Sequence, residues 1–228
     1  GHATAAALLE AGVPVRMITG DHFETAYHIG RQLGLVETRE QVFDSRQIDE
    51  LGEHELLRRV YSARVFSRVT PENKYRILQV LKAKEVTAMT GDGVNDVPAL
   101  SNAHVGVAMG SGSQIAKDAG GMILLDDNFA SIIQAMKEGR IIFSNIRRML
   151  FYLLSTNTGE AITMVSAIAL GMPMPLQPVQ ILWINLVTDT SMVIPLGLEP
   201  GEKDIMKRKP IQPTAPLLSM YMITRIIL

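Results

Sequence analysis

The fold is decided by the stretch Val86-Thr-Ala-Met-Thr-Gly-Asp-Gly-Val-Asn-Asp-Val-Pro-Ala-Leu100. Residues 86–90 predict a buried strand, and the glycine and polar residues after them predict a turn at its carboxyl end. The tripeptide of this turn, Thr-Gly-Asp, also occurs earlier, at the end of the strand-like run 13–19. Both tripeptides are therefore expected at strand ends, where open α/β sheets bind their ligands.

Short apolar runs alternate with helical patterns through residues 1–127. One helix is predicted over 22–34, and another over 71–84 with Thr70 as its N-cap and Pro71 in its first turn. Strands separated by helices predict repeated β-α units and a mainly parallel sheet. The predicted strands cover residues 13–19, 63–67, 86–90, 104–108 and 122–125.

The turn after the third of these strands carries the strongest chemical signal. Asp92, Asn95 and Asp96 supply carboxylate and amide oxygens, and Mg²⁺ favours one or two carboxylates together with phosphate oxygens. Gly91 and Gly93 allow the backbone to approach a phosphate closely. The alternative interpretation is an ordinary Asp-Gly turn with a capping side chain.

Two other positions suggest phosphate chemistry. Thr19 and Gly20, beside Asp21, offer a hydroxyl and an amide at the start of a helix, where phosphate oxygens bind readily. Ordinary helix capping is the alternative at this position. Lys74, one turn into the helix that begins at Pro71, can pair with a phosphate as a point charge. The alternative for this lysine is a solvated surface side chain.

The composition excludes several classes of protein. The 22 basic and 23 acidic residues give a net charge of -1, which argues against nucleic-acid binding. The chain contains no cysteine, which excludes disulfides and thiolate metal sites, and the spacing of its five histidines does not resemble a zinc site. The sequence starts within a helical pattern and stops within an apolar run, so we expect a piece of a longer protein.

Two apolar segments predict a membrane hairpin. Residues 149–170 contain one charged side chain, Glu160, and residues 179–198 contain one, Asp189, while a spanning helix needs roughly 20 mostly apolar residues. Basic residues flank only the outer ends of this pair, which predicts that both ends and the α/β domain are cytosolic. Pro195 should kink the second span or free backbone carbonyls. The predicted organisation is an α/β domain over 1–136, a stalk and first span over 137–170, a second span over 179–198, a cytosolic loop over 199–216 and the start of a third span over 217–228.

Polar side chains at bilayer depth predict a cation site. Asn157 and Glu160 share one face of the first span, and Asn185, Thr188 and Asp189 share one face of the second. Ionisable groups inside a membrane are costly and are usually functional. Oxygen ligands from two facing helices would suit a hard cation, and hydrogen bonding between the helices is the alternative.

Six strings occur in order along the chain: Thr19-Gly-Asp, Thr70-Pro-Glu-Asn-Lys, Thr90-Gly-Asp-Gly-Val-Asn-Asp, Asp127-Asn-Phe-Ala-Ser, Asn157-Thr-Gly-Glu and Asn185-Leu-Val-Thr-Asp. Together they resemble the P-type ATPases, and most of all the calcium-pump branch. The resemblance implies an α/β haloacid dehalogenase-like (Rossmannoid) phosphorylation domain followed by an α-helical transmembrane hairpin. One departure is Val97, which stands where the family usually has Ala.

The resemblance also implies roles for individual residues. In the family the first Thr-Gly-Asp contacts the phosphoryl group, the helix lysine stabilises its charge, and the Gly-Asp-Gly loop holds magnesium and orders the site. The residues so implied are Thr19, Gly20, Asp21 and Lys74 for phosphate, Asp92 for Mg²⁺, and Asn95 and Asp96 in support. The membrane strings imply a site for a transported cation, calcium by preference, formed by Asn157, Glu160, Asn185, Thr188 and Asp189.

The phosphorylated aspartate of the family lies in an Asp-Lys-Thr-Gly-Thr string, on a strand central to the sheet and upstream of the nucleotide-binding domain. That string does not occur here. The resemblance therefore implies part of a multi-pass, ion-translocating ATP hydrolase that works with Mg²⁺, ATP, the lipid bilayer, the nucleotide-binding and actuator domains and other transmembrane helices. By itself the chain is expected to be inactive. The alternatives are a soluble phosphatase of the same fold and a non-catalytic, membrane-anchored fragment.

Overall fold

The computed structural model describes residues 2–211 and 215–227, without the side chains of Asp189 and Ile227. Residues 212–214 of the expected cytosolic loop and Leu228 of the expected third span therefore lie outside the described residues. The chain divides into two compact units. We call them the α/β unit, Gly1–Ala135 with Lys207–Pro213, and the helical unit, Met136–Met206 with Thr214–Leu228.

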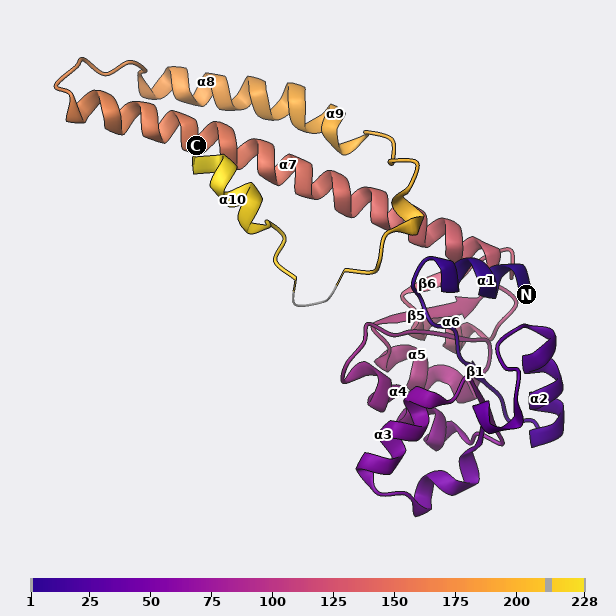
Figure 1. The fold of residues 1–228 in the computed structure, drawn as a ribbon. Coiled ribbons are helices and arrows are strands. Elements are labelled where there is room, and N and C mark those ends of the chain that lie inside the picture. The colour runs from indigo at the N-terminus through magenta and orange to yellow at the C-terminus, as the bar shows by residue number, and fades with distance from the viewer. Residues whose placement is uncertain (1, 212–214, 228) are drawn as a thin grey trace. The chain divides into compact units, whose positions relative to one another are not determined.

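Two three-stranded parallel sheets form the α/β unit (Figure 1). Parallel pairing confirms the predicted α/β class, but the strands divide between two sheets, with β1 and β4 each at an edge. The first sheet has the order β1-β3-β2, with β1 at Met17–Ile18, β3 at Val65–Ser67 and β2 at Val42–Asp44. The second has the order β4-β5-β6, with β4 at Ala88–Gly91, β5 at Val105–Met109 and β6 at Met122–Leu124.

The first sheet differs from the sequence prediction in two strands. Strand β2 was not predicted, because three residues carry little periodic signal. Its extended conformation depends on pairing with β3. The expected strand 13–19 is reduced to Met17–Ile18. Pro14 lies in the part that is lost, and proline cannot donate to a strand ladder.

Helices separate the strands, as the alternating pattern predicted. The helix expected over 71–84 is present as α4, Pro71–Lys82, and Oγ1 of Thr70 accepts a hydrogen bond from the Asn73 amide at 3.2 Å, which confirms the predicted N-cap. The helix expected over 22–34 is α2, Phe23–Gln32. The other elements are α1 His2–Glu10, η1 Arg39–Gln41, η2 Ser45–Glu50, α3 Glu53–Ser62, η3 Val94–Asp96, α5 Val97–Asn102 and α6 Gln114–Ala119.

The two sheets share a hydrophobic core although no ladder joins them. Ile18 of β1 packs against a buried cluster formed by Leu78 of α4, Met89 of β4 and Ala99 of α5. Phe66 of β3 is fully buried in a second cluster, and burying such a side chain is worth about 1.5–3 kcal/mol. Apolar packing therefore holds β1 and β4 near each other, with their carboxyl ends available for a site.

The helical unit is dominated by α7, which runs without a break from Ala130 to Ala169 after beginning in the α/β unit (Figure 1). At 1.5 Å per residue it is about 60 Å long. Near its middle, Asn145 is 3% exposed and its Nδ2 donates to the carbonyls of Gly197 at 3.1 Å and Glu199 at 2.9 Å. Other elements are α8 Pro178–Thr188, a π-helical segment η4 Asp189–Val193, α9 Ile194–Gly197, η5 Ile205–Lys207 and α10 Met220–Ile227.

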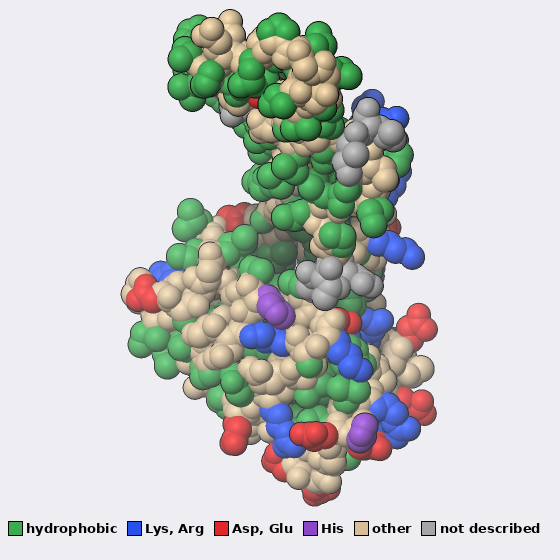
Figure 2. Space-filling view, turned by 90° about the vertical axis from the view of Figure 1, so that its left-hand side faces the viewer, with side chains coloured by type: hydrophobic (Ala, Val, Ile, Leu, Met, Phe, Trp, Pro, Cys, Tyr) green, Lys and Arg blue, Asp and Glu red, His purple; other side chains and the backbone are tan. Residues whose placement is uncertain are grey.

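The helical unit exposes much apolar surface. Within the described residues, Pro178–Gly197 is long and apolar enough to cross a membrane by length and composition, with a mean hydropathy of 1.3. The expected first span, inside α7, does not meet the same measure, because the polar run 155–160 lowers its mean hydropathy. Hydrophobic side chains cover much of this unit in Figure 2, and Leu182 and Trp183 are among the most exposed.

Candidate phosphate and cation sites

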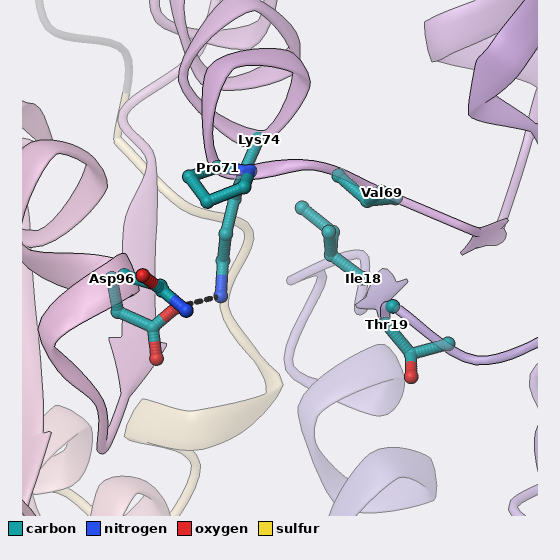
Figure 3. Close-up of a pocket in the computed structure, with 8 residues that line it drawn as sticks. Ile18, Thr19, Val69, Pro71, Lys74 and Asp96 are labelled. Carbon is teal, nitrogen blue, oxygen red and sulfur yellow. Dashed lines mark hydrogen bonds and ion pairs between the residues drawn. The ribbon is translucent and has the colours of Figure 1, made fainter.

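The carboxyl end of β1 and the turn after β4 line one cavity of about 210 Å³ (Figure 3). Thr19 and Gly20 contribute from the end of β1, Lys74 from α4, and Asn95 and Asp96 from η3. The structure therefore brings together five of the seven residues that the sequence predicted for phosphate and magnesium. Ile18, Val69 and Pro71 complete the lining.

An ion pair between Lys74 and Asp96 lies in this cavity. The Lys74 Nζ donates to Oδ1 of Asp96 at 2.6 Å, and the two side chains are 16% and 14% exposed (Figure 3). Burial alone would raise the pKa of Asp96, but the Lys74 ammonium and the backbone amides of Gly93 and Asp92 hold that pKa below its usual range. Lys74 is thus not a solvated surface lysine, and its charge is directed into the cavity.

Asp96 also shapes the turn that precedes it. Its Oδ2 accepts hydrogen bonds from the amides of Asp92 at 3.1 Å and Gly93 at 3.3 Å. The carboxylate packs directly on Gly91, where a Cβ atom would lie 2.5 Å from that of Asp96. The carboxyl group of Asp96 is therefore engaged in ordering the turn.

Asp92 differs from Asp96 because its carboxylate is exposed and has no hydrogen-bond or ion-pair partner among the described residues. Its backbone is nevertheless fixed, since its carbonyl accepts from the Ser113 amide at 2.8 Å. A fixed backbone with an unengaged carboxylate fits a Mg²⁺ ligand, and Mg²⁺ takes few protein ligands when phosphate oxygens are present. The described residues contain no group of three or more His, Cys, Asp or Glu side chains suited to a metal.

The side chains of the first Thr-Gly-Asp loop make hydrogen bonds within the loop rather than capping bonds to α2. The Thr19 hydroxyl donates to Oδ2 of Asp21 at 2.9 Å and accepts from the Asp21 amide at 3.2 Å. The N-cap of α2 is His22, which makes no side-chain capping bond. The capping alternative for Thr19 and Asp21 is therefore wrong, and Thr19 lines the cavity.

The predicted cation ligands lie on α7, α8 and the first residue of η4 in the helical unit. Asn157 is exposed and lines an open groove along α7, while Glu160 is half-buried on the same helix. The Thr188 hydroxyl donates to the carbonyls of Ile184 at 2.8 Å and Asn185 at 3.3 Å. Among the described side chains, no hydrogen bond or ion pair joins the α7 residues to those of α8. The side chain of Asp189 lies outside this description.

The irregularity expected near Pro195 is present as the π-helical segment Asp189–Val193. Pro195 lacks the N–H that would bond the carbonyl four residues earlier, so the carbonyl of Ser191 receives no hydrogen bond from residue 195. Single π-helical turns occur often at functional sites. The Ser191 carbonyl is thus a further candidate ligand beside Asn185 and Thr188.

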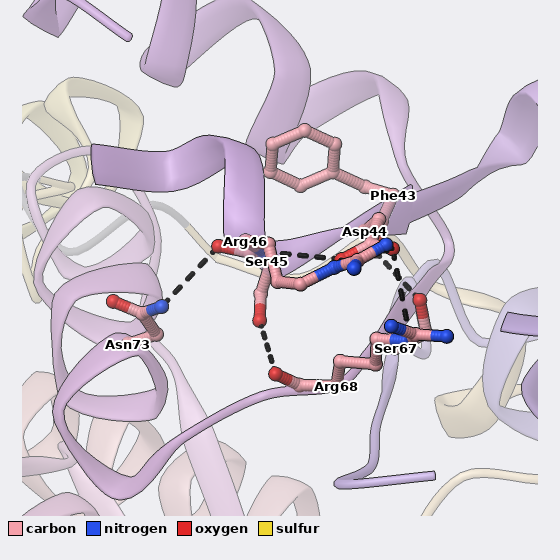
Figure 4. A network of polar contacts seen from close by, with 7 residues as sticks. All are labelled: Phe43, Asp44, Ser45, Arg46, Ser67, Arg68 and Asn73. Carbon is pink, nitrogen blue, oxygen red and sulfur yellow. Dashed lines mark hydrogen bonds and ion pairs between the residues drawn. The ribbon is translucent and has the colours of Figure 1, made fainter. Parts of the chain in front are cut away.

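Sequence analysis missed a polar network at the carboxyl ends of β2 and β3. Ser45, Ser67 and Asn73 are buried there and hydrogen bonded to backbone carbonyls (Figure 4). Polar residues directly after a strand are the signal that could have revealed Ser45. That signal was hidden because β2 was not recognised as a strand.

Comparisons with known proteins agree with both units. A family model described as haloacid dehalogenase-like hydrolase matches residues 2–104, and a second model of that description matches residues 74–136. A model described as cation transporting ATPase, C-terminus, matches residues 173–228. The two haloacid dehalogenase-like models therefore match the α/β unit, and the cation transporting ATPase model matches the C-terminal helices.

Curated relatives match nearly the whole chain. A calcium-transporting ATPase of Bacillus subtilis is 47% identical over 206 residues, which is 90% of this chain and 23% of that protein. A probable cation-transporting ATPase F of Mycobacterium tuberculosis is 44% identical over 229 residues, 98% of this chain and 25% of that protein. The chain thus spans about a quarter of the length of these relatives.

A solved structure supports the fold. The crystal structure of a zinc-transporting PIB-type ATPase in an E2.Pi state has a TM-score of 0.60 and 23% sequence identity, covering 86% of this chain and 26% of that one. At this identity the likeness bears on the fold alone.

Proposed function

This chain corresponds to a segment of the P-type cation ATPase family, and on that premise we propose that it joins the phosphate chemistry of an ATP-driven cation pump to its cation path. The α/β unit supplies part of the phosphorylation site. Helices α7 and α8 supply part of the cation site. In the full-length protein, formation and loss of an aspartyl phosphate would bias two conformations of the pump.

The observation that carries this proposal is the pair of sheet edges at the cavity. Strands β1 and β4 lie at the edges of separate sheets and pack on one core, and a Thr-Gly-Asp tripeptide lies at the carboxyl end of each. The family places its phosphorylated aspartate on a strand central to one sheet. A strand from elsewhere in the full-length protein, inserted between β1 and β4, would bring that aspartate to Lys74 and Asp92.

The residues around the cavity have complementary tasks. Lys74 would neutralise charge on a transferred phosphoryl group, and the Thr19 hydroxyl and Gly20 amide would orient its oxygens. Asp96 keeps Lys74 and the Gly91–Gly93 turn in place. Bound Mg²⁺, with Asp92 as a ligand, would neutralise charge on the phosphoryl oxygens. Catalysis would rest on positioning and electrostatic stabilisation.

We propose calcium as the transported cation. Its support is the name of the Bacillus subtilis relative and the oxygen ligands on α7 and α8. Calcium takes six to eight oxygens, so Asn157, Glu160, Asn185, Thr188 and Asp189 would share the ion with backbone carbonyls and with other helices of the pump. The exposed apolar surface of the helical unit suits a lipid bilayer, with the α/β unit in the cytosol.

The test is cation-dependent phosphorylation of the full-length protein by ATP. Calcium, manganese, sodium and potassium would be compared for stimulation of ATP hydrolysis and of acid-stable phosphoenzyme. Glu160→Gln should abolish calcium-dependent phosphorylation, whereas the exposed Glu40→Gln on η1 should behave as wild type. Full calcium-dependent phosphorylation in Glu160→Gln would reject the proposed cation site, and no phosphoenzyme in the wild type would reject the pump assignment.

A further inference from the structure

The polar network in Figure 4 connects two parts of the proposed phosphate site through one serine. Ser45 is fully buried at the carboxyl end of β2, and its hydroxyl donates to the Arg68 carbonyl at 2.7 Å. The Ser45 carbonyl accepts from Nδ2 of Asn73 at 3.2 Å. Buried polar groups of this kind need partners, and here each partner lies next to a residue of the cavity.

The first connection runs through a strained turn. Arg68 has a φ of 53°, in the left-handed region that non-glycine residues seldom occupy. Its amide donates to the Asp21 carbonyl at 2.8 Å, and the next amide, that of Val69, donates to the Thr19 carbonyl at 3.0 Å. The turn at Arg68 therefore holds the first Thr-Gly-Asp loop, and the Ser45 hydroxyl holds the turn.

The second connection runs into the start of α4. Asn73 is 6% exposed and directly precedes Lys74 in the first turn of that helix. Its amide is capped by Thr70, while its side chain reaches back to Ser45. The position of Lys74 therefore depends on the same serine that holds the Arg68 turn.

We propose that Ser45 is a positioning residue that sets the Thr19-Gly20-Asp21 loop and Lys74 at a common distance from a bound phosphoryl group. Its hydroxyl stabilises the left-handed backbone of Arg68, and its carbonyl anchors Asn73. Ser45 acts through these neighbours and has no contact with the cavity. This inference rests on the proposed function, because it assigns Ser45 to the same phosphate site.

Strained backbone is found where surrounding contacts over-determine it, often at functional sites. Glycine at position 68 would adopt the observed φ without help from Ser45. The effect of removing the Ser45 hydroxyl should therefore depend on whether residue 68 is arginine or glycine. If Ser45 only stabilised the fold, the effect of Ser45→Ala on phosphate binding would not depend on whether residue 68 is arginine or glycine.

The experiment uses the full-length protein, with inorganic phosphate as the probe in the absence of the transported cation. The phosphate concentration for half-maximal phosphorylation is measured for wild type, Ser45→Ala, Ser45→Thr, Arg68→Gly and the double variant Ser45→Ala/Arg68→Gly, together with each melting temperature. Ser45→Ala should raise this concentration about five- to tenfold, the range expected for a lost buried hydrogen bond. Ser45→Thr keeps the hydroxyl and should restore phosphate binding toward the wild-type value.

The double variant decides between positioning and stability. Relative to Arg68→Gly alone, adding Ser45→Ala should change the half-saturating phosphate concentration less than about twofold. If Ser45→Ala weakened phosphate binding as much in the Arg68→Gly protein as in the wild type, the inference would be overturned. It would also be overturned if Ser45→Ala lowered the melting temperature but left phosphate binding unchanged. Both results would leave the pump assignment intact, whereas a wild-type protein that phosphate and ATP both fail to phosphorylate would reject the two together.

Discussion

The ammonium of Lys74 and the carboxylate of Asp96 meet at 2.6 Å although 22 positions separate them in the sequence. Lys74 belongs to α4, which packs on the first sheet, while Asp96 ends the turn after β4 of the second. This ion pair is therefore a polar link between two sheets that share no ladder. Its loss should affect both the stability and the chemistry of the α/β unit.

The first prediction concerns acid stability. The folded-state pKa of Asp96 is depressed, so its contribution is fully present above the unfolded pKa, near 4, and is lost as the pH falls through the lower folded value. Asp96→Asn should lower the melting temperature at pH 7. It should also make the decrease in melting temperature between about pH 4 and pH 2 smaller than in the wild type. Thermal unfolding of the full-length protein across this range is the measurement. Asp49→Asn, at an exposed position, should keep the wild-type pH profile.

The second prediction separates two neighbouring glycines. A Cβ at Gly91 would lie 2.5 Å from the Asp96 Cβ, whereas a Cβ at Gly93 would meet its nearest atoms at 3.9 Å. Gly91→Ala should displace Asp96, destabilise the protein by about 1–3 kcal/mol and reduce phosphoenzyme formation. Gly93→Ala serves as the matched control for added volume. Equal unfolding free energies for the two variants would contradict the packing described here.

The third prediction distinguishes the two carboxylates of the turn. Asp92→Asn removes an exposed carboxylate without a protein partner, so the free energy of unfolding should change by less than about 0.5 kcal/mol. The Mg²⁺ concentration needed for half-maximal phosphorylation should nevertheless rise at least about tenfold, since Mg²⁺ prefers carboxylate ligands. Magnesium titration and thermal unfolding of the same preparation provide both values. An unchanged magnesium requirement would remove Asp92 from the metal site.

The fourth prediction concerns the helical unit. Asn145→Ala would leave the Gly197 and Glu199 carbonyls without their donor in a buried setting, at a cost of about 1–3 kcal/mol. Limited proteolysis of the segment after α9 should become faster, because that segment loses its attachment to α7. The adjacent Ser144→Ala is the control, and equal cleavage rates in the two variants would show that Asn145 does not hold the segment.

The sequence predicted those parts of the site that local chemistry defines. Thr70 and Pro71 specify the start of α4, and that helix presents Lys74 at the cavity as expected. The turn from Gly91 to Asp96 was likewise predicted from its glycines and acidic residues. In each case the signal lies within a few consecutive residues, so tertiary context was not needed to find it.

Features that depend on distant contacts were not predicted. Strand β2 exists because Val42 and Phe43 pair with β3, and the roles of Ser45 and Asn73 follow from that pairing. The left-handed backbone of Arg68 has no local signal, because arginine carries no preference for it. The separation into two sheets was also not predicted, because sequence patterns identify strands but do not show which strands pair with each other.

The unpaired sides of β1 and β4 have a practical consequence for handling this polypeptide. An edge strand presents backbone donors and acceptors that can template association with other chains. Strands β2 and β6 are also at sheet edges, and several edge strands on one small domain favour self-association during expression. Soluble, monomeric protein should therefore be easier to obtain when a complementary strand is supplied in the same polypeptide, and light scattering of the two preparations would show the difference.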